Sequence, residues 1–147
     1  MPRHDIFLRG LVTFAAVGLL AFICWIIWLA DTGRSSVFFD LVKMLPYGDK
    51  LGHFLLFGPL TFGINTALQF RKARLGRIAV PLGSLLVLCF VLLEEFSQHF
   101  VPGRTLDLLD LLADSAGIAL FTWFSLLLEQ RIRARNSAAA VHLLVSP

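Results

Sequence analysis

The residues of this sequence that could do chemistry fall into three short groups, each at the end of an apolar stretch. They are Asp49, Lys50 and His53; then Glu94, Glu95, Gln98 and His99; then Asp107, Asp110 and Asp114, which we call the aspartate stripe. Residues three or four apart lie on one face of a helix, so a helix would align each group along a single side. The three carboxylates of the aspartate stripe would fall within about 60° of arc.

Three kinds of chemistry suit these residue types. His53 or Glu95 could move protons as a general acid or base. The aspartate stripe, together with water molecules, could hold a hard cation. Lys50 and Arg104 could bind the phosphate of a lipid headgroup while the acids orient its polyol or amine. The sequence has no glycine-rich phosphate loop, zinc-protease helix or serine-hydrolase elbow, so we assign no metal site and leave the cofactor open.

Structural roles compete with these chemical ones. Asp107 suits the start of a helix, where a carboxylate caps the helix and favours its dipole. Glu94 fits the water-exposed end of a helix equally well. Asp114 and His53 fall inside apolar stretches, where a structural polar network and a ligand-binding or catalytic role are equally supported. The acids of the three groups outnumber the cations, so some acids must be protonated, solvated or matched by a metal or a cationic ligand.

The elements that must position these groups are long apolar stretches. The chain has 147 residues, of which 57% are hydrophobic and only 16% charged. The apolar stretches cover residues 10–30, 51–70, 78–98 and 108–128. A helix needs about 20 apolar residues to cross a bilayer, and so short a chain cannot bury four such helices in a soluble fold. The sequence therefore predicts an all-α integral membrane protein, an antiparallel bundle of four transmembrane helices.

The connections between these helices set the predicted orientation. Residues 36–45 indicate a short helix that lies in the membrane interface within the first outer loop. Residues 71–77 form a tight basic turn, and residues 129–147 a basic cytoplasmic tail. Nine Lys and Arg residues lie on the side of the two termini and four on the other side, and the richer side is cytoplasmic by the positive-inside rule. The basic balance reflects this topology and anionic lipid, so we expect no nucleic-acid partner.

The polar groups carry a resemblance to a known family. In chain order the motifs are Asp49-Lys50-x-x-His53, Glu95-x-x-Gln98, Val101-Pro102-Gly103-Arg104, Asp107-x-x-Asp110 and Gly117. This ordered set resembles the VanZ-like family of small membrane proteins, which implies that residues 1–128 form a VanZ-like four-helix membrane domain. The chain departs from the family pattern at two positions. Asp114 stands where the family usually has Asn, and Phe121 stands where a second Gly is common.

The resemblance implies a role in cell-envelope metabolism at the outer face of the inner (plasma) membrane, because the family's namesake is linked to teicoplanin resistance. We expect a multi-pass protein that binds a lipid or lipid-linked cell-wall precursor. The ligand-binding residues expected for it are Asp49, Lys50, His53, Glu95, Gln98, Arg104, Asp107, Asp110 and Asp114. One alternative is a hydrolase or transferase that uses His53, Glu95 and Asp110. Another is an assembly partner whose buried charges lock the bundle, and the oligomeric state stays open.

Overall fold

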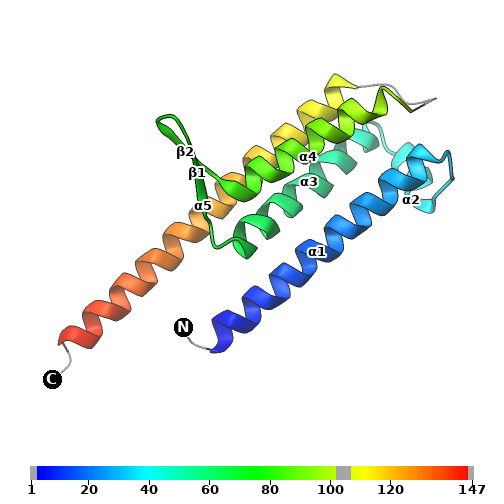
Figure 1. Ribbon diagram of the computed structural model, residues 1–147. Coiled ribbons are helices and arrows are strands. Elements are labelled where there is room, and N and C mark those ends of the chain that lie inside the picture. The colour runs from blue at the N-terminus through cyan, green and yellow to red at the C-terminus, as the bar shows by residue number, and fades with distance from the viewer. Residues whose placement is uncertain (1–2, 102–106, 146–147) are drawn as a thin grey trace.

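The computed structural model describes residues 3–101 and 107–145, with side chains from residues 7–101 and 107–138. In chain order the described elements are α1 (Arg3–Asp31), α2 (Val37–Lys43), α3 (Gly48–Ala67), β1 (Lys72–Leu75), β2 (Ile78–Pro81), α4 (Leu82–Gln98) and α5 (Leu108–Val145). Helices α3, α4 and α5 lie side by side, and α1 runs along α3 (Figure 1). Helix α1 begins and α5 ends at the same end of the molecule. The fold is therefore mostly helical, as predicted, with one added hairpin.

The connection between α3 and α4 differs from the predicted tight turn. Strands β1 and β2 pair in antiparallel register, with Lys72 opposite Pro81 and Leu75 opposite Ile78. Gly76 has a positive φ of 63°, which a two-residue hairpin loop requires at its first central position. The predicted helical stretch 78–98 is thus wrong at its start, because its first four residues belong to β2. Helix α4 begins at Leu82 and has 17 residues.

Helix α5 is longer than the predicted transmembrane stretch. It has 38 residues and continues to Val145, so the segment predicted as a separate tail is helical over residues 129–145. Beyond Glu129 the sequence has neither Gly nor Pro before Pro147, and an ion pair four residues apart supports the helix at Glu129 and Arg133. The charges that suggested a tail thus lie on a continuous helix.

The remaining helix bounds follow from local backbone chemistry. The predicted short helix is present as α2, and the Ser36 hydroxyl caps it by accepting a hydrogen bond from the Phe38 amide at 3.3 Å. Helix α3 ends at Ala67, three residues before the end of the predicted stretch 51–70. The reason is that Gln69 and Phe70 adopt positive φ values, which a helix cannot continue.

Within the described residues, two helices are long and apolar enough to cross a membrane. These segments are Phe7–Asp31 and Leu108–Ala138. In their most apolar windows only 11% and 22% of the residues are buried, so most of their apolar side chains face outward. Helix α4 is shorter than the roughly 20 residues of a full span, and the predicted four-span arrangement is therefore shown only as a helical bundle with two candidate spans.

The centre of the bundle combines a small apolar core with close helix contacts. The buried core residues are Ile23, Phe57, Leu60, Val87, Val91 and Ile118. A Cβ atom at Gly117 of α5 would lie 2.8 Å from the backbone oxygen of Phe54 in α3, so the two helices touch along their backbones. The ring of Phe121 occupies the space beside Gly58. Phe121 stands where the VanZ-like pattern commonly has a second Gly on α5. Its larger side chain fits because the residue that faces it on α3, Gly58, has no side chain.

A buried polar network joins α3, α4 and α5. The Asn65 side chain of α3 donates hydrogen bonds to the hydroxyls of Ser84 on α4 at 2.9 Å and Ser125 on α5 at 3.3 Å. Its oxygen accepts from the Ser84 backbone amide at 3.1 Å. Ser84 also bonds to the hydroxyl of Thr122 at 2.6 Å. This network fixes the relative positions of the three helices that carry the functional groups.

Candidate functional site

The three groups of polar residues meet at one end of the bundle, between α3, α4 and α5. We call this assembly the polar cluster; its members are Asp49, Lys50, His53, Glu94, Glu95, Gln98, Asp107, Asp110 and Asp114. Arg104 was also predicted here, but it lies outside the described residues. His99 is exposed, and its ring meets that of Phe100 edge-on. The helices thus unite nearly all of the site residues expected from the sequence.

Lys50 is the centre of one half of the cluster. Its Nζ lies 2.6 Å from Asp49, 2.5 Å from Asp107 and 2.8 Å from Asp110. Hydrogen bonds from this ammonium hold the pKa values of Asp49 and Asp107 below their usual range. Burial by itself would lower the pKa of Lys50, but its bonds to the three carboxylates outweigh that effect and raise it. The ion pairs of Lys50 therefore join α3 to the start of α5.

Asp107 caps α5, as its position in the sequence predicted, and also pairs with Lys50. Its Oδ1 accepts a hydrogen bond from the Leu109 amide at 2.8 Å and so caps α5. Its Oδ2 accepts from the ammonium of Lys50. The cap of α5 is thereby tied to the first turn of α3.

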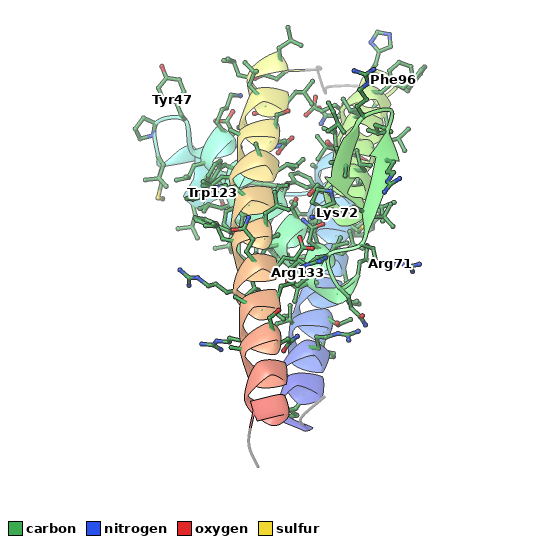
Figure 2. All side chains as sticks on the ribbon, turned by 90° about the vertical axis from the view of Figure 1, so that its left-hand side faces the viewer. Tyr47, Arg71, Lys72, Phe96, Trp123 and Arg133 are labelled. Carbon is green, nitrogen blue, oxygen red and sulfur yellow. The ribbon has the colours of Figure 1, made fainter. Side chains whose placement is uncertain are left out.

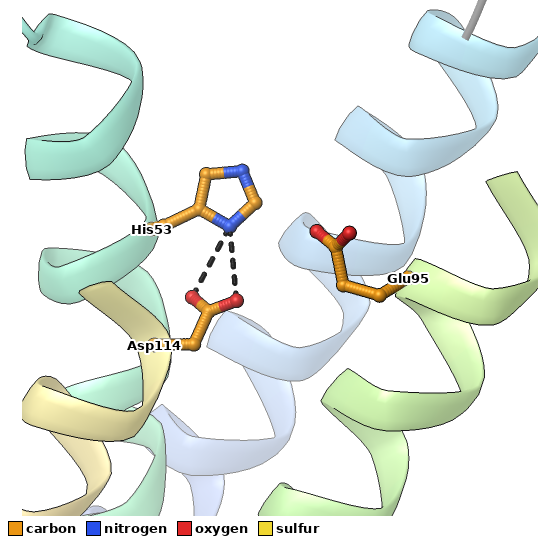
Figure 3. A group of neighbouring side chains, drawn as sticks. All are labelled: His53, Glu95 and Asp114. Atoms are coloured by element: carbon orange, nitrogen blue, oxygen red, sulfur yellow. Dashed lines mark hydrogen bonds and ion pairs between the residues drawn. The ribbon is translucent and has the colours of Figure 1, made fainter. Parts of the chain in front are cut away.

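His53 and Asp114 form the deeper half of the cluster. Both oxygens of Asp114 lie 3.1 Å from Nδ1 of His53 (Figure 3), and Asp114 is completely buried. The other ring nitrogen, Nε2, is 3.9 Å from Asp110. Asp110 therefore lies between the Lys50 half and the His53 half. The aspartate stripe is thus split between these two partners, and its three carboxylates do not gather as one set of ligands, which was one of the possibilities considered.

Helix α4 contributes two adjacent buried carboxylates held by one amide. Gln98 Nε2 donates to both oxygens of Glu94 at 3.0 Å and to Oε1 of Glu95 at 3.3 Å. Glu95 is only 2% exposed, and its Oε2 has no hydrogen-bond partner among the residues that the structure describes. Glu94 thus belongs to the cluster, although its sequence position fitted the end of a helix equally well.

The arrangement supports two kinds of chemistry. A carboxylate that holds one nitrogen of an imidazole orients the other nitrogen to act as a base, which fits Asp114 and His53. Donor atoms of His53, Glu95 and Asp114 all lie within 4.8 Å of one another, a separation suited to ligands of one metal ion. A second set of three carboxylates, Asp49, Asp107 and Asp110, meets the same distance limit, but these surround the Lys50 ammonium.

A buried ion-pair group at the opposite end was not predicted. Glu129 of α5 is 5% exposed and accepts from Lys72 of the hairpin at 2.8 Å and from Arg133 at 2.7 Å (Figure 2). This group attaches the hairpin to α5. The four-residue spacing of Glu129 and Arg133 was visible in the sequence, but the contact with Lys72 depends on the fold.

Comparison with protein families identifies the chain. The profile of the VanZ/LLP1 family matches residues 9–129, a range that contains the whole polar cluster. Comparison with the curated proteins and with the solved structures gives no significant match. Because the family profile covers most of the chain, the protein belongs to the VanZ/LLP1 family.

Proposed function

We propose that this protein is a multi-pass protein of the plasma membrane that binds the headgroup of a lipid or lipid-linked cell-wall precursor in the polar cluster, at the extracytoplasmic face. The observation that carries the proposal is the convergence of ionisable side chains from α3, α4 and α5 on one end of an apolar bundle. Ionisable groups inside membrane-spanning segments, such as His53 and Asp114, are functional-site hypotheses by default. His53 and Asp110 keep 23% and 17% of their side chains exposed, so a headgroup can reach them.

The distribution of charge supports the proposed orientation. The basic residues of the hairpin and of the C-terminal half of α5, among them Lys72 and Arg133 (Figure 2), lie toward the end of the bundle away from the start of α3, where the polar cluster is. The positive-inside rule assigns that basic end to the cytoplasm. Helices α3 and α4 would then cross beside α1 and α5. At 1.5 Å per residue α4 spans about 26 Å, which places the hairpin close to the inner interface.

The cluster favours headgroup hydroxyls and amines as its direct contacts. Carboxylates accept hydrogen bonds from such donors, and the cluster is rich in them. Lys50, in contrast, already donates to three carboxylates, so we assign it to positioning these acids and not to binding phosphate. Arg104 remains our proposed phosphate-binding cation.

A second candidate function is favoured by the pairing of His53 with Asp114. The pair resembles the base and orienting carboxylate of hydrolases and transferases. In that case His53 would move the proton, and Glu95 and Asp110 would contact the reacting group.

Mass spectrometry of co-purifying lipids tests both candidates. Wild type, Glu95→Gln, Asp110→Asn and the control Asp40→Asn, an exposed acid of α2, are purified in the same detergent. Binding predicts one enriched lipid species in wild type and the control, with several-fold less of it in Asp110→Asn. Catalysis predicts that Glu95→Gln retains a species that wild type releases in altered form, and the two masses then name the reaction.

The structural alternative gives a different pattern. If the cluster only locks the bundle, no species exceeds its share of bulk lipid in any variant, and Asp110→Asn mainly lowers the yield of folded protein. That result would overturn the headgroup proposal.

A further inference from the structure

One set of ligand-type side chains in the polar cluster comes from three different helices. It consists of His53 from α3, Glu95 from α4 and Asp114 from α5, and we call it the inner triad (Figure 3). Its donor atoms all lie within 4.8 Å of one another. We propose that the inner triad binds a divalent transition-metal ion of the Mn²⁺ to Zn²⁺ class. The inner triad belongs to the polar cluster, but its ligands come from the protein alone, so the ion can be tested without any lipid.

The geometry is close to that of a metal site. Ligand atoms at 2.0 to 2.2 Å from a common ion lie about 3.0 to 3.5 Å apart. The Nδ1 atom of His53 is 3.1 Å from each oxygen of Asp114. Glu95 reaches toward this pair from the facing helix (Figure 3). Small side-chain rotations would therefore complete the coordination.

Glu95 supplies an independent observation that a ligand belongs here. Its side chain is 98% buried, and its Oε2 has no hydrogen-bond partner among the described residues. A buried polar atom without a partner costs free energy, and coordination of a cation would remove that cost. Gln98 holds the other oxygen, Oε1, at 3.3 Å, as second-layer partners do for metal-binding carboxylates.

The other carboxylate set serves as an internal comparison. Asp49, Asp107 and Asp110 lie equally close together, but the ammonium of Lys50 is within 2.8 Å of each. That set has a cation supplied by the chain itself. The inner triad has no lysine among its described contacts. Its nitrogen-bearing member is the His53 imidazole, which can be protonated or can act as a metal ligand.

The donor types select the class of metal. An imidazole nitrogen with two carboxylates suits Mn²⁺, Fe²⁺ or Zn²⁺, whereas Mg²⁺ and Ca²⁺ prefer ligand sets made only of oxygen. All three donors come from different helices, so the ion would also tie α3, α4 and α5 together.

Metal binding to the full-length, tag-free protein in detergent tests this proposal. The protein is treated with a chelator and then equilibrated with Zn²⁺ or Mn²⁺ alone, with no lipid precursor added. We expect about one bound ion per chain by elemental analysis, and a melting temperature that rises with metal concentration. Glu95→Gln and Asp114→Asn should bind at least about 10-fold more weakly, because losing a ligand costs no less than losing its second-layer partner.

Two controls separate ligand loss from misfolding. Without metal, Glu95→Gln should melt no lower than wild type, because the substitution removes a buried carboxylate oxygen that has no partner. Asp40→Asn removes one exposed carboxylate of α2, outside the polar cluster, and should bind the ion as wild type does. The proposal is overturned if wild type shows neither a bound ion nor a metal-dependent shift, or if Asp40→Asn weakens binding as much as Glu95→Gln.

Discussion

Lys50 illustrates how one residue organises several others. Its ammonium contacts three carboxylates that come from two parts of the chain, and without it these acids would repel one another. Their mutual repulsion would separate the first turn of α3 from the start of α5. The lysine therefore positions the acids of the polar cluster more than it presents a free charge to a ligand.

The pH dependence of stability tests this role. Asp49 and Asp107 have pKa values below those of the unfolded chain, so the unfolded state binds more protons in the acid range. Their contribution is present above about pH 4 and is lost as the pH falls through the folded-state pKa values. We expect Lys50→Met to lower the melting temperature most at pH 7. The difference from wild type should shrink as the pH falls below 4, measured by thermal unfolding in detergent.

Lys43→Met is the matched control for this prediction. Lys43 lies exposed on α2, so its removal should change the melting temperature little at any pH. A difference between wild type and Lys50→Met that stays constant from pH 7 to pH 3 would contradict the assignment of Lys50 to the carboxylates.

The helix pair α3 and α5 holds the site together at the scale of elements. Gly117 brings the two backbones into contact, and Gly58 accepts the ring of Phe121. Small residues at such crossings let helices approach closely in membrane proteins. Both halves of the polar cluster lie on this pair, so their separation depends on it.

We expect Gly117→Ala to destabilise the protein by about 1 to 3 kcal/mol, the usual cost of overpacking. The added Cβ would meet the backbone of Phe54, which cannot rotate away as a side chain could. Gly52→Ala is the control, since a Cβ at Gly52 meets nothing within 4 Å. It should leave stability unchanged or raise it by up to about 1 kcal/mol. Denaturant titration of both variants checks this, and equal stability of the two would refute the backbone contact.

The basic hairpin is the element that the sequence pattern concealed. Residues 78–81 are apolar or proline and read as the start of a helix, whereas Gly76 allows the chain to fold back as a hairpin. Glu129 then pairs with Lys72 and anchors the hairpin on α5. The buried carboxylate of Glu129 is thus paired with Lys72 and Arg133 at the point where α5 continues past the apolar stretch.

Orientation in the membrane belongs to the scale of the whole molecule. Single cysteines are placed at Tyr47, just before α3, and at Arg74 in the hairpin, in a chain with Cys24→Ala and Cys89→Ala. Both positions are exposed, and Figure 1 shows the start of α3 and the hairpin at opposite ends of that helix. A membrane-impermeant maleimide applied to intact cells should label Tyr47→Cys and not Arg74→Cys, because the positive-inside rule assigns the basic hairpin to the cytoplasm. Permeabilised cells, in which both should react, provide the control. Labelling of Arg74→Cys in intact cells would place the polar cluster on the cytoplasmic side.

The sequence by itself determined the helical character of the chain and nearly all members of the polar cluster. Long apolar stretches favour helices whatever their surroundings, and groups spaced by three or four residues fall on one helix face regardless of packing. The short helix α2 was predictable for the same local reason, since its cap lies next to it in the chain. The predicted helix ends were less accurate at Ala67, Leu82 and Val145. Turn geometry sets the first two ends, and near the third a contact between distant residues, Lys72 and Glu129, pairs a buried charge of the extended helix.

Only the tertiary structure decided which charges are partners. The sequence places the three carboxylates of the aspartate stripe on one helix face. In the structure, Lys50 pairs with Asp107 and Asp110, whereas His53 pairs with Asp114. Likewise, burial of Glu95 beside His53 and Asp114 depends on the crossing of three helices. Electrostatic pairing falls steeply with distance and with exposure to water. It is therefore set by the packing of helices against each other, which no spacing within a single helix specifies.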